Sequence, residues 1–283
     1  MALFSMFYAL VFEWVEFLAC YKGDIKETFP AITTVRLPEE RRMYVATDAH
    51  PLTVIIIVGT LMVTPIYVFA TYVFSGASRQ KGMGIGIAAL VVGAFMFWVC
   101  LSGLPNKLGL LGNLIVPAAW VLPSLALFLL RKWFLAERLS QKWLVGLQLF
   151  RVIGALFLLE MAREDLPGIF AYPAGIGDVL AAMVALGVLV RYRGSLSIPG
   201  GAVMLVIIVG VVDFVSAFFF GFFSSETPLQ LFFPAVANNV IAFPTGLIPL
   251  FLVPYAIFFH VLSGLNYVMN DRDVVGESGL RGT

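Results

Sequence analysis

Residues 201–223 read GAVMLVIIVGVVDFVSAFFFGFF, an almost unbroken apolar run whose only charged residue is Asp213. A helix needs about 20 such residues to cross the hydrocarbon core of a bilayer. The run lacks the alternation of apolar and polar residues that is typical of an outer-membrane barrel strand, so it predicts a transmembrane helix. With similar runs elsewhere it predicts an all-α polytopic bundle of about eight spans, at residues 1–20, 52–75, 83–104, 109–131, 142–163, 168–191, 201–223 and 243–267.

The composition of the whole chain supports this class of protein. Hydrophobic residues make up 60% of the chain and charged residues 12%, whereas soluble domains carry about 25% charged residues. A net charge of +1, without a block of basic residues, excludes nucleic acid as a partner. We therefore expect residues 1–283 to form a single transmembrane domain, whose surroundings are the lipid bilayer.

The positions of lysine and arginine predict the orientation of the bundle. Most basic residues of the short connections fall on one side if the spans alternate: Arg79, Lys81, Arg131, Lys132, Arg138, Lys142, Arg191 and Arg193. The positive-inside rule places that side in the cytoplasm together with both termini. The loops 21–51, 105–108, 164–167 and 224–242 are then outside, although the first of them departs from the rule because it carries several basic residues.

The loop 21–51 is the largest predicted segment outside the bilayer. Two β-prone runs flank its polar turn, so a small β-hairpin and a plain connector are both open interpretations. Cys20 and Cys100 are predicted near the outer ends of their spans, where a disulfide could form, although buried free thiols are the more common state.

The sequence lacks motifs for a metal, a cofactor or catalysis. The two cysteines form no CxxC pair, and neither His50 nor His260 has a second ligand three or four residues away. The two histidines are also predicted at opposite sides of the membrane. GxSxG and Walker A motifs are missing as well, so we predict no metal and no cofactor, and an enzyme is disfavoured.

Charged side chains within the predicted spans concentrate in residues 142–267. These are Arg151, Glu160, Asp178 and Asp213, and each costs about 2.5–3.5 kcal/mol in the bilayer unless it finds a partner or a wet cavity. Small residues lie three and four positions from both aspartates, so these carboxylates are predicted to face neighbouring helices rather than lipid. Arg151, Asp178 and Asp213 also fall at a similar depth, which predicts an ion pair between them.

Two interpretations of this polar seam remain open. In the first, Arg151 and the aspartates form a buried ion-pair lock that only fixes the helix register. In the second, one carboxylate is left to bind a cation or relay a proton, as in transporters. Asn238 and Asn239, in the punctuated segment 228–242, complete the candidate ligand-binding set of Arg151, Glu160, Asp178, Asp213, Asn238 and Asn239.

Proline punctuates two of the predicted spans. Pro173 favours the first turn of a helix, so the sixth span either begins there or continues through it with a kink. Prolines also recur through the span 243–267, at residues 244, 249 and 254, so this helix is expected to be bent or locally unwound.

The second half of the chain resembles an uncharacterised family of bacterial multi-pass membrane proteins. The residues that carry the resemblance are FRVIG at 150–154, LP at 166–167, FAYPAGIGD at 170–178, PLQ at 228–230, FP at 243–244, IP at 248–249, FLVP at 251–254 and His260. The resemblance covers about residues 142–266. It implies a multi-pass protein of the bacterial inner membrane and marks Arg151, Asp178 and His260 for attention, but it implies no reaction.

Transport or permeation of a small solute or ion, through a polar site that opens outward, is the leading functional interpretation. The alternative is a non-catalytic subunit or assembly factor of a larger membrane complex, with the phenylalanine-rich faces as contact surfaces for protein, lipid, quinone or pigment. A stoichiometric membrane-protein partner would favour the subunit, and a monomer or homo-oligomer would favour the carrier.

Overall fold

The computed structural model of the chain describes residues 50–271, in which every regular element is a helix. The predicted span 1–20, nearly all of the loop 21–51 with its possible hairpin, and Cys20 lie outside these residues. The helices are α2 (Pro51–Phe74), α3 (Arg79–Leu101), α4 (Leu104–Lys107), α5 (Leu110–Leu129), α6 (Arg131–Phe134), α7 (Gln141–Gly146), η3 (Leu147–Gly154), α8 (Ala155–Ala162), α9 (Gly168–Arg191), α10 (Gly200–Ser224), η4 (Ile248–Leu252), α11 (Val253–Asn266) and η5 (Tyr267–Asp271).

Seven helical stretches among the described residues are long and apolar enough to cross a membrane, which fits an integral multi-pass membrane protein. They are Pro51–Phe74, Arg79–Leu101, Leu110–Leu129, Gln141–Ala162, Gly168–Arg191, Gly200–Ser224 and Ile248–Met269. The first six agree with the predicted spans to within four residues at each end. These six predictions rest on long apolar runs with clear polar breaks, which is the strongest signal that a membrane sequence carries.

The last span begins at Ile248 rather than at residue 243. The preceding residues 240–247 form turns, held by hydrogen bonds from Ala242 N to Asn239 O (2.8 Å) and from Leu247 N to Pro244 O (3.1 Å). Their side chains are nevertheless buried. The apolar run therefore extends into turns that pack inside the protein, and hydropathy alone does not separate these turns from the helix.

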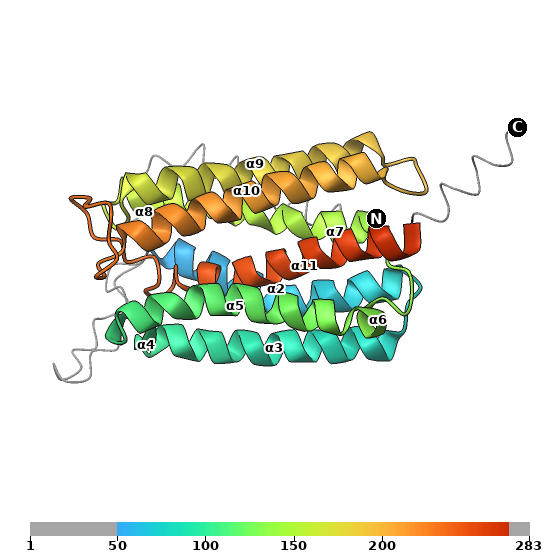
Figure 1. Cartoon of the computed structure of the whole chain (residues 1–283), viewed down its shortest axis with the longest axis horizontal. Coiled ribbons are helices and arrows are strands. Elements are labelled where there is room, and N and C mark those ends of the chain that lie inside the picture. The colour runs from blue at the N-terminus through green and yellow to red at the C-terminus, as the bar shows by residue number, and fades with distance from the viewer. Residues whose placement is uncertain (1–49, 272–283) are drawn as a thin grey trace, which may run out of the picture. The chain divides into compact units, whose positions relative to one another are not determined.

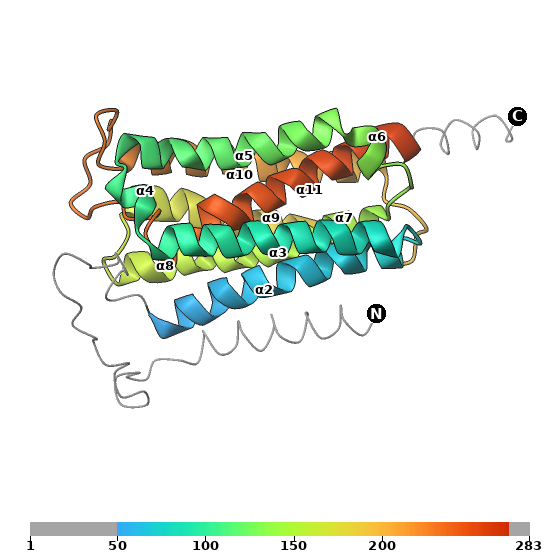
Figure 2. The same cartoon turned by 90° about the horizontal axis from the view of Figure 1, so that it is seen from below.

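The spans run side by side along the long axis of the bundle (Figure 1). Seen from below, α11 lies in the middle, between α5 and α10 on one side and α2 and α3 on the other (Figure 2). The stretches Gln141–Ala162 and Ile248–Met269 are the most enclosed, with 61% of the residues buried in each, against 22–44% in the other five. The polar groups carried by these two central stretches therefore face protein rather than lipid.

Both central stretches depart from α-helical geometry. The stretch Gln141–Ala162 contains a 3₁₀ segment, η3, and the stretch Ile248–Met269 opens with a π-helical segment, η4, that includes Pro249. Long 3₁₀ runs and π turns are uncommon and recur at functional sites. In contrast, α9 begins at Gly168 and continues through Pro173, so of the two alternatives for this span the continuous helix is found.

Hydrogen bonds between polar side chains join the two central stretches towards the C-terminal end of α11. Gln141 Nε2 donates to Ser263 O (2.9 Å), and Ser263 Oγ donates back to Gln141 Oε1 (2.8 Å). Asn266 accepts from Leu139 N through Oδ1 (3.0 Å) and donates to Leu139 O through Nδ2 (2.9 Å). These paired bonds fix the register of the two stretches.

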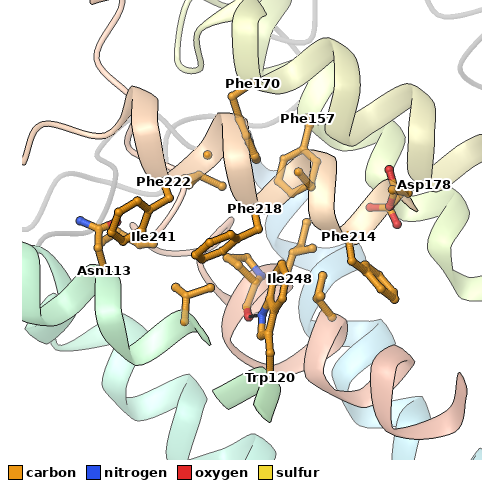
Figure 3. Close-up of a pocket in the computed structure, with 17 residues that line it drawn as sticks. Asn113, Trp120, Phe157, Phe170, Asp178, Phe214, Phe218, Phe222, Ile241 and Ile248 are labelled. Carbon is orange, nitrogen blue, oxygen red and sulfur yellow. Dashed lines mark hydrogen bonds between the residues drawn. The ribbon is translucent and has the colours of Figure 1, made fainter. Parts of the chain in front are cut away.

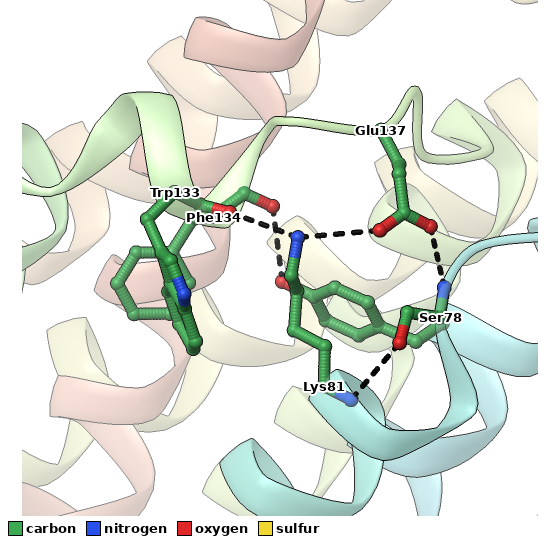
Figure 4. A network of polar contacts seen from close by, with 6 residues as sticks. Ser78, Lys81, Trp133, Phe134 and Glu137 are labelled. Carbon is green, nitrogen blue, oxygen red and sulfur yellow. Dashed lines mark hydrogen bonds and ion pairs between the residues drawn. The ribbon is translucent and has the colours of Figure 1, made fainter.

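The two ends of the bundle differ. The connections after α2, α5 and α9, which carry the basic residues, lie at one end, whereas the segment 225–247 and α4 lie at the other (Figure 1). At the basic end, Lys81 Nζ lies 3.3 Å from Glu137 Oε1 and donates to Trp133 O at 3.0 Å (Figure 4). Glu137 also accepts a bond from Ser78 N, so the turn between α2 and α3 is tied to the segment after α6.

Candidate binding site

Arg151 is the centre of a buried cluster of charged side chains. Its Nε donates to Asp178 Oδ1 at 2.8 Å, and its Nη2 donates to Asp213 Oδ2. Its Nη1 lies 3.4 Å from His260 Nε2, and its Cζ lies 4.0 Å from the ring centre of Phe214. The side chain of Arg151 thus receives contacts from α9, α10 and α11, and the predicted pairing with the aspartates is confirmed.

The 3₁₀ geometry of η3 explains how one segment reaches several helices. In a 3₁₀ helix, residues three apart lie almost directly above one another, so Gln148, Arg151 and Gly154 share one edge. Gln148 Nε2 donates to Ala256 O of α11 at 3.3 Å, and Gly154 packs against Asp178. The edge of η3 therefore presents its polar groups to α9 and α11 together.

Glycines allow the helix backbones to approach closely around the cluster. A Cβ atom at Gly154 would overlap Asp178, one at Gly177 would overlap Asp213, and one at Gly210 would overlap both His260 and Arg151. The predicted seam of small residues is therefore present, and it is most tightly packed where the charges lie.

The cluster contains two carboxyl groups and one guanidinium. A guanidinium can only donate hydrogen bonds, so His260 Nε2 accepts from Arg151 and the imidazole is neutral. One positive group then faces the two carboxylates Asp178 and Asp213. Asp213 Oδ1 is buried and has no hydrogen-bond partner among the described residues. The second carboxyl group is therefore neutralised either by a proton or by a further positive group.

A pocket adjoins the two carboxylates. Its cavity volume is about 50 Å³, which is room for a few water molecules or a small cation. Figure 3 shows Asp178 at one side of the pocket and Asn113 at the opposite side, with aromatic rings between them. The rings are those of Trp120, Phe157, Phe170, Phe214, Phe218 and Phe222.

Trp120 closes one wall of this pocket and connects it to η4. Its Nε1 donates to Pro249 O at 2.7 Å, which satisfies a carbonyl of the π-helical turn. Its ring lies 6.1 Å from that of Phe214 and 5.6 Å from that of Phe218, centre to centre. The shape of the pocket thus depends on the irregular start of the last span.

Three predicted site residues lie outside the cluster. Glu160 accepts a bond from Thr53 and has Arg163 Nε 3.9 Å away. Asn238 donates to Gly221 O (3.1 Å) and to Ser224 Oγ (2.7 Å), which fastens the segment 225–247 to the end of α10. Asn239 is exposed. The structure therefore brings together Arg151, Asp178 and Asp213 but leaves the other three apart from them.

His50 lies near Glu160, just outside the spans. Burial, together with the positive charge of Arg163, lowers the pKa of His50 below its usual value. Its Nδ1 accepts a bond from Leu52 N at 3.2 Å and so caps α2.

His260 and the aromatic wall were not part of the predicted site. His260 was expected near the inner end of its span, but it lies mid-span beside Arg151 because the span begins at Ile248. The sequence does contain a pattern that indicates the aromatic wall of the pocket: Phe214, Phe218 and Phe222 recur every four residues, on one face of α10. Phenylalanine-rich helices usually face lipid, and this pattern was interpreted in that way.

A family model described as a domain of unknown function, DUF8737, matches residues 108–265, which is more than half of the chain. The match contains Arg151, Asp178, Asp213 and His260, and it reaches back to α5, whereas the resemblance in the sequence was limited to residues 142–266. No curated protein and no solved structure matches the chain.

Proposed function

Because the chain belongs to the DUF8737 family of unknown function, we propose a role from its geometry: it binds a small positively charged solute and moves it across the membrane. The observation that carries this proposal is the second carboxyl group of the Arg151 cluster, which exceeds the single guanidinium and belongs to a residue that lines a pocket. Intramembrane carboxylates that are not fully paired commonly mark cation paths.

The position of the pocket supports entry from one side. Asn113, near the start of α5, and Val240 and Ile241 of the segment 225–247 line it, and it extends to Asp178 and Asp213 near the middle of their helices. These outer lining residues belong to the end of the bundle opposite the basic connections. By the positive-inside rule that end faces outward, and with it the mouth of the proposed path.

The irregular start of the last span is the element that we expect to move. A π-helical turn and two prolines, Pro249 and Pro254, weaken the regular hydrogen bonding of this span. Movement of η4 would displace Pro249 from Trp120 and change the wall of the pocket, which links the bound solute to a change of access.

We expect the substitution Asp213→Asn to abolish uptake without unfolding the protein. Asparagine can still accept a hydrogen bond from Arg151, but the cluster becomes neutral and no longer attracts a cation. The measurement is uptake of radiolabelled methylammonium into proteoliposomes, driven by an inside-negative potential, compared with protein-free liposomes.

Glu137→Gln is the matched control, because it removes a carboxylate that binds Lys81 at the other end of the bundle. Its uptake should equal that of the wild-type protein. Wild-type uptake no faster than in protein-free liposomes, or full uptake by the Asp213→Asn protein, would overturn the proposal.

The orientation has a separate test. In a cysteine-free background, Asn239→Cys should react with a membrane-impermeant thiol reagent added outside intact cells, because Asn239 is exposed at the end opposite the connections after α2, α5 and α9. Arg193→Cys, exposed at the basic end, should react only after the membrane is permeabilised. The reverse pattern would invert the topology and place the mouth of the pocket in the cytoplasm.

Purification in a mild detergent distinguishes the transporter from a subunit of a larger complex. A carrier should elute as a monomer or homo-oligomer that retains uptake after reconstitution. A stoichiometric second protein whose removal abolishes uptake would favour the subunit.

A further inference from the structure

The segment that follows α10 forms the outer wall of the pocket. The cavity of about 50 Å³ holds only a few water molecules, so a larger molecule cannot enter until a wall moves. Val240 and Ile241 of this segment line the pocket, and both are buried. Access from the outer side therefore depends on what holds these two residues in place.

Asn238 fastens this wall to the end of α10 with both polar groups of its side chain. Its Nδ2 donates to Gly221 O at 3.1 Å and to Ser224 Oγ at 2.7 Å, and its Oδ1 accepts from Val240 N at 3.1 Å. Asn238 is only 6% exposed, so water competes little for these bonds. Gly221 also lines the pocket, so the bonds of Asn238 join two of its walls.

At its other end the outer wall continues into η4, whose Ile248 and Pro249 also line the pocket. The connection is made by turns, in which Ala242 N donates to Asn239 O at 2.8 Å and Gly246 N donates to Ala242 O at 2.6 Å. Segments without a regular ladder of backbone hydrogen bonds open at a lower cost in free energy than helices do. The wall is thus fixed by Asn238 at one end and joined at the other to the element that we expect to move.

We infer that residues 238–247 are the outer gate of the pocket and that Asn238 is the latch that keeps this gate closed. The inference rests on the proposed function, because it names the residue that controls entry to the same site. When η4 moves, the bonds of Asn238 break, Val240 and Ile241 leave the wall, and the pocket opens to the outside. Asn238 is a positioning residue, since it acts on the pocket through Val240 and Ile241.

The test measures how fast a cysteine in the pocket reacts with a thiol reagent that is too large for the closed cavity, a methanethiosulfonate with a quaternary ammonium group. Val116 of α5 lines the pocket and is buried, so Val116→Cys in the otherwise cysteine-free full-length protein reports access. We expect Asn238→Ala to raise the labelling rate at least about tenfold, because three hydrogen bonds that hold the closed form are lost. Asn238→Asp, which keeps the size of the side chain but loses both donated bonds, should act in the same direction and serves if the alanine variant folds poorly.

Asn239→Ala is the matched control, because Asn239 is the neighbouring residue but is exposed, and it should leave the labelling rate unchanged. Val145→Cys, buried in a hydrophobic cluster with residues of α9 and α10, reports general loosening and should stay unreactive when Asn238 is replaced. An unchanged rate at Val116→Cys in both Asn238 variants, or an equal rise at Val145→Cys, would overturn the inference. Labelling requires no transport, so faster labelling without any uptake of methylammonium would remove the proposed function and leave the gate.

Discussion

Arg151→Ala is expected to prevent the protein from accumulating in a folded form. The substitution leaves Asp178 and Asp213 as two neighbouring carboxylates in a site where each is only 6% exposed. Removing one partner of a buried ion pair typically costs about 3–5 kcal/mol, and proteins are stable by only about 5–15 kcal/mol. The measurements are the yield of monodisperse protein in mild detergent and the midpoint of its thermal unfolding.

Arg163→Ala is the appropriate control for this substitution. Arg163 also lies near acidic residues, but its side chain is 34% exposed at the end of α8, where water can solvate the charges that remain. We expect a yield close to that of the wild-type protein.

A variant without charges in the cluster shows whether Arg151→Ala destabilises the protein by removing the partner of the carboxylates or by removing packing. The triple variant Arg151→Met, Asp178→Asn, Asp213→Asn removes all three charges and keeps similar volumes, so it should recover much of the stability lost in Arg151→Ala. A triple variant as unstable as the single one would contradict the electrostatic explanation and attribute the loss to packing.

Gly154→Ala is expected to have the second largest effect on stability. The new methyl group would overlap the Cβ atom of Asp178, which cannot rotate away because it is attached directly to the backbone of α9. Overfilling a packed interior costs about 1–3 kcal/mol, and here α9 must also move away from Arg151. The measurement is the midpoint of thermal unfolding in detergent.

Gly187→Ala provides the comparison, because a Cβ atom at Gly187, also on α9, would meet no atom within 4 Å. Alanine is favoured over glycine in a helix by about 1 kcal/mol, so this variant should be as stable as the wild-type protein or more so. Equal midpoints for the two variants would mean that α9 and η3 are not in close contact.

The sequence predicts much of this fold because an apolar run of about 20 residues has few alternatives to a transmembrane helix. It also predicts the ion pairs of Arg151, since charges in hydrocarbon must find partners and Asp178 and Asp213 lie at the same depth. Glu160 also finds a partner, Thr53, but this residue is distant in sequence and belongs to a span with no charged residue, so the sequence does not indicate it. The depth of a charged residue in the membrane is therefore predictable from one sequence, whereas the helices that contact that residue are not.

The start of the last span shows a second kind of limit. Hydropathy follows apolar residues, and residues 243–246 are mostly apolar and buried but not helical. A change of helix type within a span has no signature in hydropathy either, so neither η3 nor η4 could be anticipated beyond the expectation that the prolines disturb the last span. Both segments contribute to the position of His260, which the sequence misplaced.

The π-helical turn at Ile248–Leu252 also sets the angular phase of everything that follows it in the last span. A π turn fits one more residue than an α turn into nearly the same rotation, so removal of a single residue from η4, with the turn closing to regular α geometry, would leave His260 facing Arg151. Removal of a residue from the regular helix between Leu252 and His260 would instead rotate His260 away from Arg151 by about 100°. The same rotation would swing Ser263 away from Gln141 and Asn266 away from Leu139. A deletion of one residue should therefore be tolerated better within this turn than in the helix between the turn and His260.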